Sequence, residues 1–83
     1  MPEEVVGMVS DFFAHPVVAG IDLGGTLKAG DKIHILGHTT DLEFVVDSMQ
    51  MDNADVPEAK AGDAVGIKVS ERVRRGDTVY KVT

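Results

Sequence analysis

The chain has 83 residues, a formal charge of −6 and no cysteine. A chain of this length predicts a single domain over residues 1–83, too small to enclose a large internal cleft. Disulfides and thiolate metal sites are excluded, and the acidic first residues and lack of an apolar run of about 18 residues predict a cytoplasmic protein outside the membrane.

Apolar residues occur in short alternating runs between Gly, Asp, Asn and Pro, and helical periodicity is absent. The runs predict six strands, at residues 5–13, 17–23, 32–36, 41–51, 64–69 and 78–82. The connections include a turn at His15–Pro16, a loop at 37–40 and a long polar stretch at 52–61. Six short strands with such turns favour an all-β fold, a small closed six-stranded antiparallel barrel.

The predicted strand 41–51 changes phase along its length. Leu42, Phe44 and Val46 set an even phase, whereas Met49 and Met51 set an odd one. A slip of one residue in a period-2 pattern indicates a β-bulge near residues 47–48.

One local motif occurs three times, each time before a predicted strand. A basic residue, a spacer and Gly-Asp precede a β-branched strand start at residues 28–33, 60–65 and 74–79. Glycine tolerates positive φ, and an Asp side chain can accept hydrogen bonds from the backbone of a turn. The motif therefore predicts three turns of the same kind.

The same segments resemble the second domain of Tu-type elongation factors. The resemblance rests on residues 17–20, 27–33, 46–49, 61–67 and 75–79. It covers nearly the whole chain, in order, and implies a barrel of the translation-protein domain II type. In translational GTPases this domain contacts ribosomal or transfer RNA, and Glu58 matches an acidic residue near the terminal adenosine of the transfer RNA.

More narrowly, the chain is similar to stand-alone translation elongation factor-like proteins. That similarity rests on residues 33–35, 37–41 and 48–50. A similar barrel is appended to some collagenase-like peptidases. No G-x-x-x-x-G-K-[ST] segment occurs in the sequence, so a nucleotide-binding P-loop is excluded.

A basic cluster near the end of the chain is the first candidate binding site. Residues 64–83 hold five bases and two acids, and Arg72, Arg74 and Arg75 lie close together in sequence. Arginines can clamp phosphates or carboxylates, although the chain's overall charge opposes non-specific RNA binding. No aromatic residue interleaves with them, which argues against base stacking. Solvated charges at a hairpin tip remain the alternative interpretation.

The loop His38, Thr39, Thr40 and Asp41 is the second candidate site for RNA or a protein partner. Its side chains can bond within the turn, or serve recognition, since loops often carry function. The spacing of His34 and His38 raises the question of a metal site. A third ligand would have to be Asp41 or His15, so we predict no metal site and no cofactor.

No catalytic constellation is evident, and no base is placed beside Ser48 by the sequence. We therefore predict a non-enzymatic binding module, a monomer or weak dimer, contacting RNA, the ribosome or a translation or RNA-modification partner. The alternatives are an accessory barrel of a separate enzyme of the collagenase-like peptidase type, and a small-molecule or metal carrier. Of the adjacent Phe12 and Phe13, one is expected to face outward and could mark a partner surface.

Overall fold

The computed structural model describes residues 3–14, 17–52 and 54–82. The predicted turn at His15–Pro16 and the suggestion of His15 as a metal ligand lie outside these residues. None of the described residues belongs to a helix that could cross a membrane.

The described residues form ten strands and no helix. Six longer strands match the six predicted from the alternating pattern: β1 (Glu3–Ala14), β2 (Val17–Leu23), β4 (Lys32–Leu36), β5 (Asp41–Val45), β9 (Ala64–Lys68) and β10 (Thr78–Val82). Four shorter strands are β3 (Leu27–Lys28), β6 (Met49–Met51), β7 (Ala54–Val56) and β8 (Glu58–Ala59). The prediction of an all-β fold is thus confirmed.

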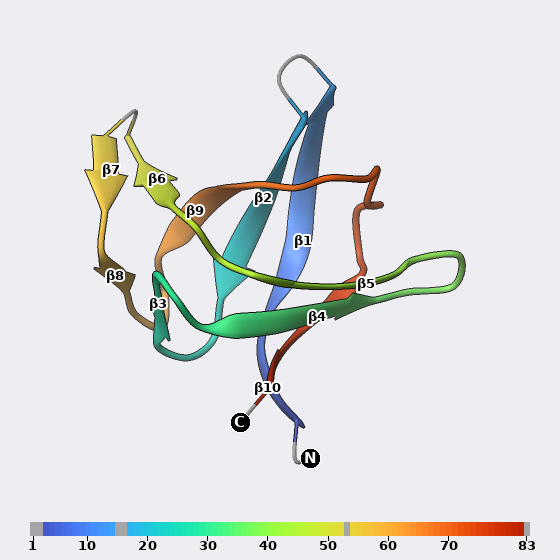
Figure 1. Ribbon diagram of the computed structural model, residues 1–83, viewed down its shortest axis with the longest axis horizontal. Coiled ribbons are helices and arrows are strands. Elements are labelled where there is room, and N and C mark those ends of the chain that lie inside the picture. Colours follow the sequence, from blue (N-terminus) through green and yellow to red (C-terminus); the bar gives the residue numbers. More distant parts are fainter. Residues whose placement is uncertain (1–2, 15–16, 53, 83) are drawn as a thin grey trace.

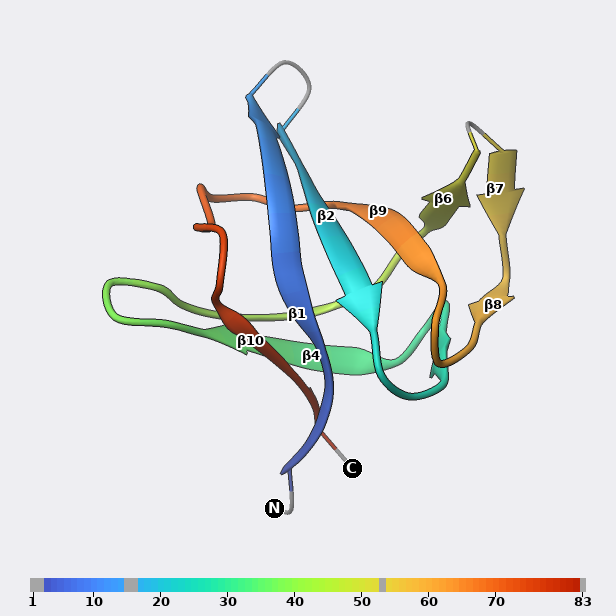
Figure 2. The ribbon, with the colours of Figure 1, turned by 180° about the vertical axis from the view of Figure 1, so that it is seen from behind.

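Eight of the strands form one antiparallel sheet in the order β5-β4-β10-β1-β2-β9-β6-β7, and β3 pairs with β8 separately. In a flat sheet β5 and β6 would lie about 29 Å apart, six strand spacings. The link of residues 46–48 between them can span at most about 14 Å. The sheet therefore curls back on itself, as Figures 1 and 2 show.

The closed six-stranded barrel of the sequence prediction needs correction. The described ladders leave the sheet with two ends, β5 and β7, and none of them joins β5 to β9. The link at 46–48 turns away from the ladder because Val46 is bonded to another turn through both its N–H and its carbonyl. The fold is an open sheet rolled around one core.

The phase change predicted in residues 41–51 is present, but as a break instead of a bulge. Val46 and Met49 are fully buried while Asp47 and Ser48 are both exposed. The register shifts among the described strands are elsewhere, at two places in β1 between Val5 and Asp11. The polar connection at 52–61 also proves to contain two short strands.

Side-chain alternation fills the interior of the roll. On β2, Ala19 and Ile21 are fully buried whereas Asp22 is exposed. The core is completed by apolar side chains from every part of the sheet, among them Val6, Val9, Ile33, Ile35, Ile67 and Val79. Because each strand has one buried face, its other face is left to solvent or to a partner.

The three Gly-Asp motifs fold into three matching turns, as predicted. In each turn the Asp Oδ2 accepts a hydrogen bond from the backbone N–H three residues earlier, at 2.9 Å. The glycines have positive φ angles: 97° at Gly30, 93° at Gly62 and 94° at Gly76. A residue with a Cβ is disfavoured at such angles.

Each turn also grips a residue on a distant segment, which the sequence did not reveal. The N–H of the turn glycine donates a hydrogen bond to the carbonyl of the distant residue at 2.7–2.9 Å. The N–H of the distant residue donates in return to the carbonyl of the turn Asp at 2.8–2.9 Å. The gripped residues are Val46, Leu23 and Val9 for the turns at 28–31, 60–63 and 74–77 respectively. All three are buried. These Gly-Asp clasps satisfy buried backbone groups that the ladders leave free.

Replacing Gly62 by Ala tests the backbone requirement of the clasps. A Cβ there would meet nothing within 4 Å, so the cost comes from the positive φ alone. We expect the free energy of unfolding to fall by about 1–2 kcal/mol in thermal or urea melts. Gly24→Ala is the matched control, because Gly24 also has open space around it but no positive φ. An equal effect of the two substitutions would contradict this account.

Candidate functional site

The three arginines lie on the segment between β9 and β10. Arg72, Arg74 and Arg75 are exposed, whereas Val73 between them is 1% exposed and anchors the segment in the core. The 74–77 clasp then fixes the segment to Val9 of β1. The arginines are therefore held at one rim of the rolled sheet by buried neighbours, and we call these three residues the arginine rim.

The fold adds an aromatic side chain to this rim. Arg72 Cζ lies 5.9 Å from the centre of the Phe12 ring, in cation–π contact. Arg75 pairs with Asp11 at 3.6 Å between Nη2 and Oδ1, both side chains being largely exposed. The sequence showed no aromatic residue among the arginines, because Phe12 comes from β1, some sixty residues earlier in the chain.

Of the two adjacent phenylalanines, one faces outward as expected. Phe13 is 54% exposed, and Phe12 packs against the core.

The loop of residues 38–41 is not a uniform recognition surface. The Gly37 N–H donates to the Thr40 carbonyl at 2.8 Å, which closes a tight turn. Thr40 is buried at 7% exposure, so only His38 and Thr39 project freely. Asp41 belongs to β5 and bonds to His34 instead.

The predicted loop lies next to the arginine rim. A side chain at Gly37 would collide with the carboxylate of Asp77, which ends the 74–77 clasp. The two candidate sites are therefore neighbouring turns, although nothing in the sequence connected them.

His34 lies between two carboxylates on the outer face of β4. Its Nε2 is 2.6 Å from Asp41 Oδ1 and its Nδ1 is 2.8 Å from Glu3 Oε2. The hydrogen bond to Asp41, and then that to Glu3, raise the pKa of His34 above its ordinary value of 6.5. The network joins β1, β4 and β5 on the outside of the sheet.

His34 and His38 do not share a grouping of three or more possible metal ligands among the described residues. Within the described part of the chain, the one grouping with metal-ligand spacing is Glu3, His34 and Glu43, whose ligand atoms lie within 4.8 Å of one another. Lys32 Nζ already lies 3.3 Å from Glu43, and both His34 ring nitrogens are bonded to carboxylates. Ion pairs within the protein account for this cluster.

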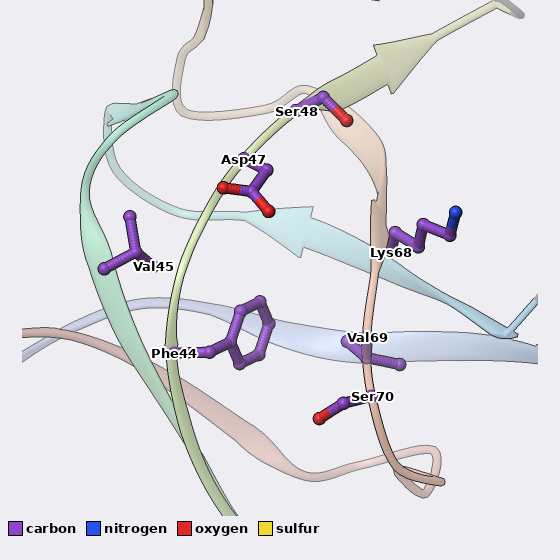
Figure 3. Close-up of a pocket in the computed structure, with 7 residues that line it drawn as sticks. All are labelled: Phe44, Val45, Asp47, Ser48, Lys68, Val69 and Ser70. Carbon is purple, nitrogen blue, oxygen red and sulfur yellow. The ribbon is translucent and has the colours of Figure 1, made fainter.

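An open groove marks the seam where β5 faces the end of β9. It is lined by side chains from two segments: Phe44, Val45, Asp47, Ser48, Lys68, Val69 and Ser70. Figure 3 shows the Phe44 ring directed toward Val69 across the seam. Ser48 therefore lies in a shallow surface groove.

Glu58, the residue that the resemblance connected with transfer RNA, starts β8. Its carboxylate lies 3.7 Å from Lys28 Nζ of β3, and both groups are exposed.

The His34 network predicts a pH dependence of stability. Because the folded-state pKa of His34 is raised, its contribution is fully present below pH 6.5 and is lost as the pH rises through the folded-state pKa. His34→Gln should therefore cost on the order of 1 kcal/mol of unfolding free energy at pH 6 and less at pH 9. Urea melts at both pH values measure this, with His38→Gln in the exposed turn as the control. A His34 titration midpoint at or below 6.5 by NMR would contradict the network.

Comparison with known structures places the fold. The C-terminal domain of a U32 peptidase from Geobacillus thermoleovorans superposes with a TM-score of 0.89 at 16% identity, covering 96% of this chain and 93% of that one. Its selenomethionine variant gives a TM-score of 0.86 at 15% identity, covering 92% of this chain and 96% of that one. These likenesses show that the two proteins share a fold.

Comparison of sequences places the family. An uncharacterized protease of Methanocaldococcus jannaschii is 47% identical over 76 residues, 90% of this chain but 19% of that protein. The chain thus spans about a fifth of that relative's length. Residues 17–80 match the family model described as Elongation factor Tu domain 2. As the resemblance indicated, the chain belongs to the Elongation factor Tu domain 2 family.

Proposed function

We propose that the chain is a non-catalytic accessory module for an enzyme of the U32 peptidase type. The observation that carries the proposal is the 47% identity to a segment making up 19% of a protease, together with the fold shared with a U32 peptidase C-terminal domain. A domain of this size cannot enclose a large cleft of its own, which suits it to binding as part of a larger enzyme. Of the functions expected from the sequence, this is the accessory-barrel alternative.

The chemistry of the described residues supports a non-catalytic role. Perturbed pKa values mark many catalytic groups, and the pKa of His34 is raised. Its two carboxylate partners, Asp41 and Glu3, explain that shift without a substrate. The seam groove is open to solvent.

A second candidate function, RNA contact, is favoured by the arginine rim. Three exposed arginines, with Phe12 beneath Arg72, combine positive charge with an aromatic ring. Proteins that bind single-stranded nucleic acids use this combination of basic and aromatic side chains. His38 and Thr39 on the neighbouring turn would add hydrogen bonds. Opposing this is the net charge of −6.

The accessory role is tested with the Methanocaldococcus jannaschii protein in three forms. These are the intact protein, a version lacking the segment that this chain matches, and a hybrid in which this chain replaces that segment. We expect hydrolysis of gelatin to fall at least about tenfold on deletion and to return within about threefold of the intact level in the hybrid, since the accessory part positions substrate or stabilises the enzyme. A well-folded hybrid no more active than the deletion version would refute the proposal.

RNA contact is tested by reversing the charge of Arg72, Arg74 and Arg75 to Glu. If the rim binds RNA, the affinity for a single-stranded oligonucleotide should fall at least about tenfold and its salt dependence should flatten. Fluorescence anisotropy at several salt concentrations measures both.

The control carries the same change of charge at Lys28, Lys32 and Lys60, which are exposed and lie outside the basic cluster of residues 64–83. It should retain affinity within about threefold. Equal RNA affinity for the rim variant and the unaltered chain would exclude the rim as the contact surface.

A further inference from the structure

One outer face of the sheet carries most of the exposed large apolar side chains. Five such residues are exposed in the described chain: Val5, Met8, Phe13, Leu36 and Val45, at 59%, 53%, 54%, 40% and 51%. All five belong to β1, β4 or β5, but Phe13 lies at the end of β1 where it pairs with Val18 of β2, beyond the part of β1 that pairs with β10. On β2 and β9 the outer positions are polar or small at Gly20, Asp22, Ala64 and Lys68, and the one larger apolar residue among them, Val18, is half-buried.

The strand register places these side chains in adjoining rows. Met8 pairs with Thr78, and Thr78 pairs with Leu36. In the next row Val5 pairs with Tyr80, and Tyr80 with His34.

A third row runs from Val82 through Lys32 to Val45. Since paired residues share a side of the sheet, the rows form one surface, with the half-buried Tyr80 at its centre. We call this surface the β10 face. Met8, Val5, Tyr80 and Val82 adjoin on this surface, whereas Thr78, His34 and Lys32 separate them from Leu36 and Val45. Exposed apolar side chains gathered on one face of a small domain are a feature of interfaces.

The border of the β10 face is acidic. Asp22 lies at one end of the Met8 row and Asp41 at the other, opposite Leu36. Glu3 and Glu43 border the remaining rows, and Lys32 is paired with Glu43. Because Glu3 and Asp41 are bonded to His34 and Glu43 is paired with Lys32, the complementary surface needs apolar side chains for the Met8 and Val5 rows and basic groups mainly beside Asp22.

The chain ends indicate which body covers the face. Glu3 and Val82 are paired at the start of β1 and the end of β10, at one edge of the β10 face, near the ends marked in Figure 1. In the Methanocaldococcus jannaschii relative the matched segment is 19% of the protein, so four-fifths of that polypeptide lies outside it. A chain continuing from either end leaves the domain beside the β10 face, within reach of it.

We propose that the β10 face docks on the remaining body of a U32-type peptidase, through an apolar surface with basic groups mainly beside Asp22. This inference rests on the proposed accessory function and names the surface that serves it. It leaves the arginine rim, beside the 74–77 clasp that precedes β10, open to solvent and to a ligand. The domain could therefore dock on the peptidase through the β10 face while the arginine rim binds a ligand.

Met8 is a built-in reporter of this docking. Dilute peroxide oxidises exposed methionine, so peptide mass spectrometry of the free chain should show rapid oxidation of Met8 and slow oxidation of Met49, which is fully buried. In the hybrid defined above, docking should slow Met8 oxidation at least about fivefold. In the hybrid carrying Leu36→Lys and Val45→Lys, Met8 oxidation should return to the rate of the free chain, because two buried charges oppose docking.

Controls separate docking from misfolding and from the proposed function. Leu36 and Val45 are exposed in the free chain, so the double variant of that chain should melt within a few degrees of the unaltered one. Phe13→Lys in the hybrid should leave Met8 protected, because Phe13 pairs with Val18 of β2, away from β10.

Free-chain oxidation rates for Met8 in an active hybrid would overturn the docking face while the accessory function stood. If Met8 is protected in a hybrid that does not hydrolyse gelatin, the docking face would be supported and only the proposed accessory function would be overturned. Protection of Met8 in the free chain that grows with concentration, together with a dimer mass, would assign the face to a second copy and overturn the proposal.

Discussion

The structure depends on three backbone clasps that hold a rolled sheet together where its ladders do not. In a sheet that curls this tightly, strands separate from their neighbours at some points. Buried N–H and C=O groups at those points are left without a partner in the strand ladders. Val9, Leu23 and Val46 are at such points, and each exchanges two hydrogen bonds with a Gly-Asp turn. Leaving a buried backbone group unpaired costs about 1–3 kcal/mol, so the turns permit the curl without that cost.

The geometry of these clasps explains why the same Gly-Asp motif occurs at three turns. Only a residue without a Cβ adopts the φ of about 95° readily, and only a short carboxylate reaches back to cap the turn from within. Asp77 shows the result most clearly, since it is buried at 6% exposure and still has its carboxylate satisfied by the Arg74 N–H. The 74–77 turn contains Arg74 and Arg75, so the same turn that holds the sheet together also sets the position of the arginine rim.

The roll separates the surface into regions of different chemistry. The arginine rim is cationic and has the Phe12 ring beneath Arg72, while the β10 face combines exposed apolar side chains with the paired charges around His34 and Lys32. Both are made from residues that lie far apart in the chain: Phe12 meets Arg72, and Glu3 meets His34. A module with two unlike surfaces can attach through one and present the other, which is the arrangement expected of an accessory domain.

The sequence by itself determined the six longer strands and the three turns, because alternation and turn chemistry act between residues only a few positions apart. It missed β3 and β8, since two-residue strands carry no periodicity. It also named all of residues 38–41 as a candidate recognition loop without distinguishing among them, and the structure buries Thr40. Tertiary structure alone decided the open seam at 46–48, the ring beneath Arg72 and the rows of the β10 face. These depend on which strands become neighbours, and strand pairing across dozens of residues is set by packing of the whole core rather than by any local pattern.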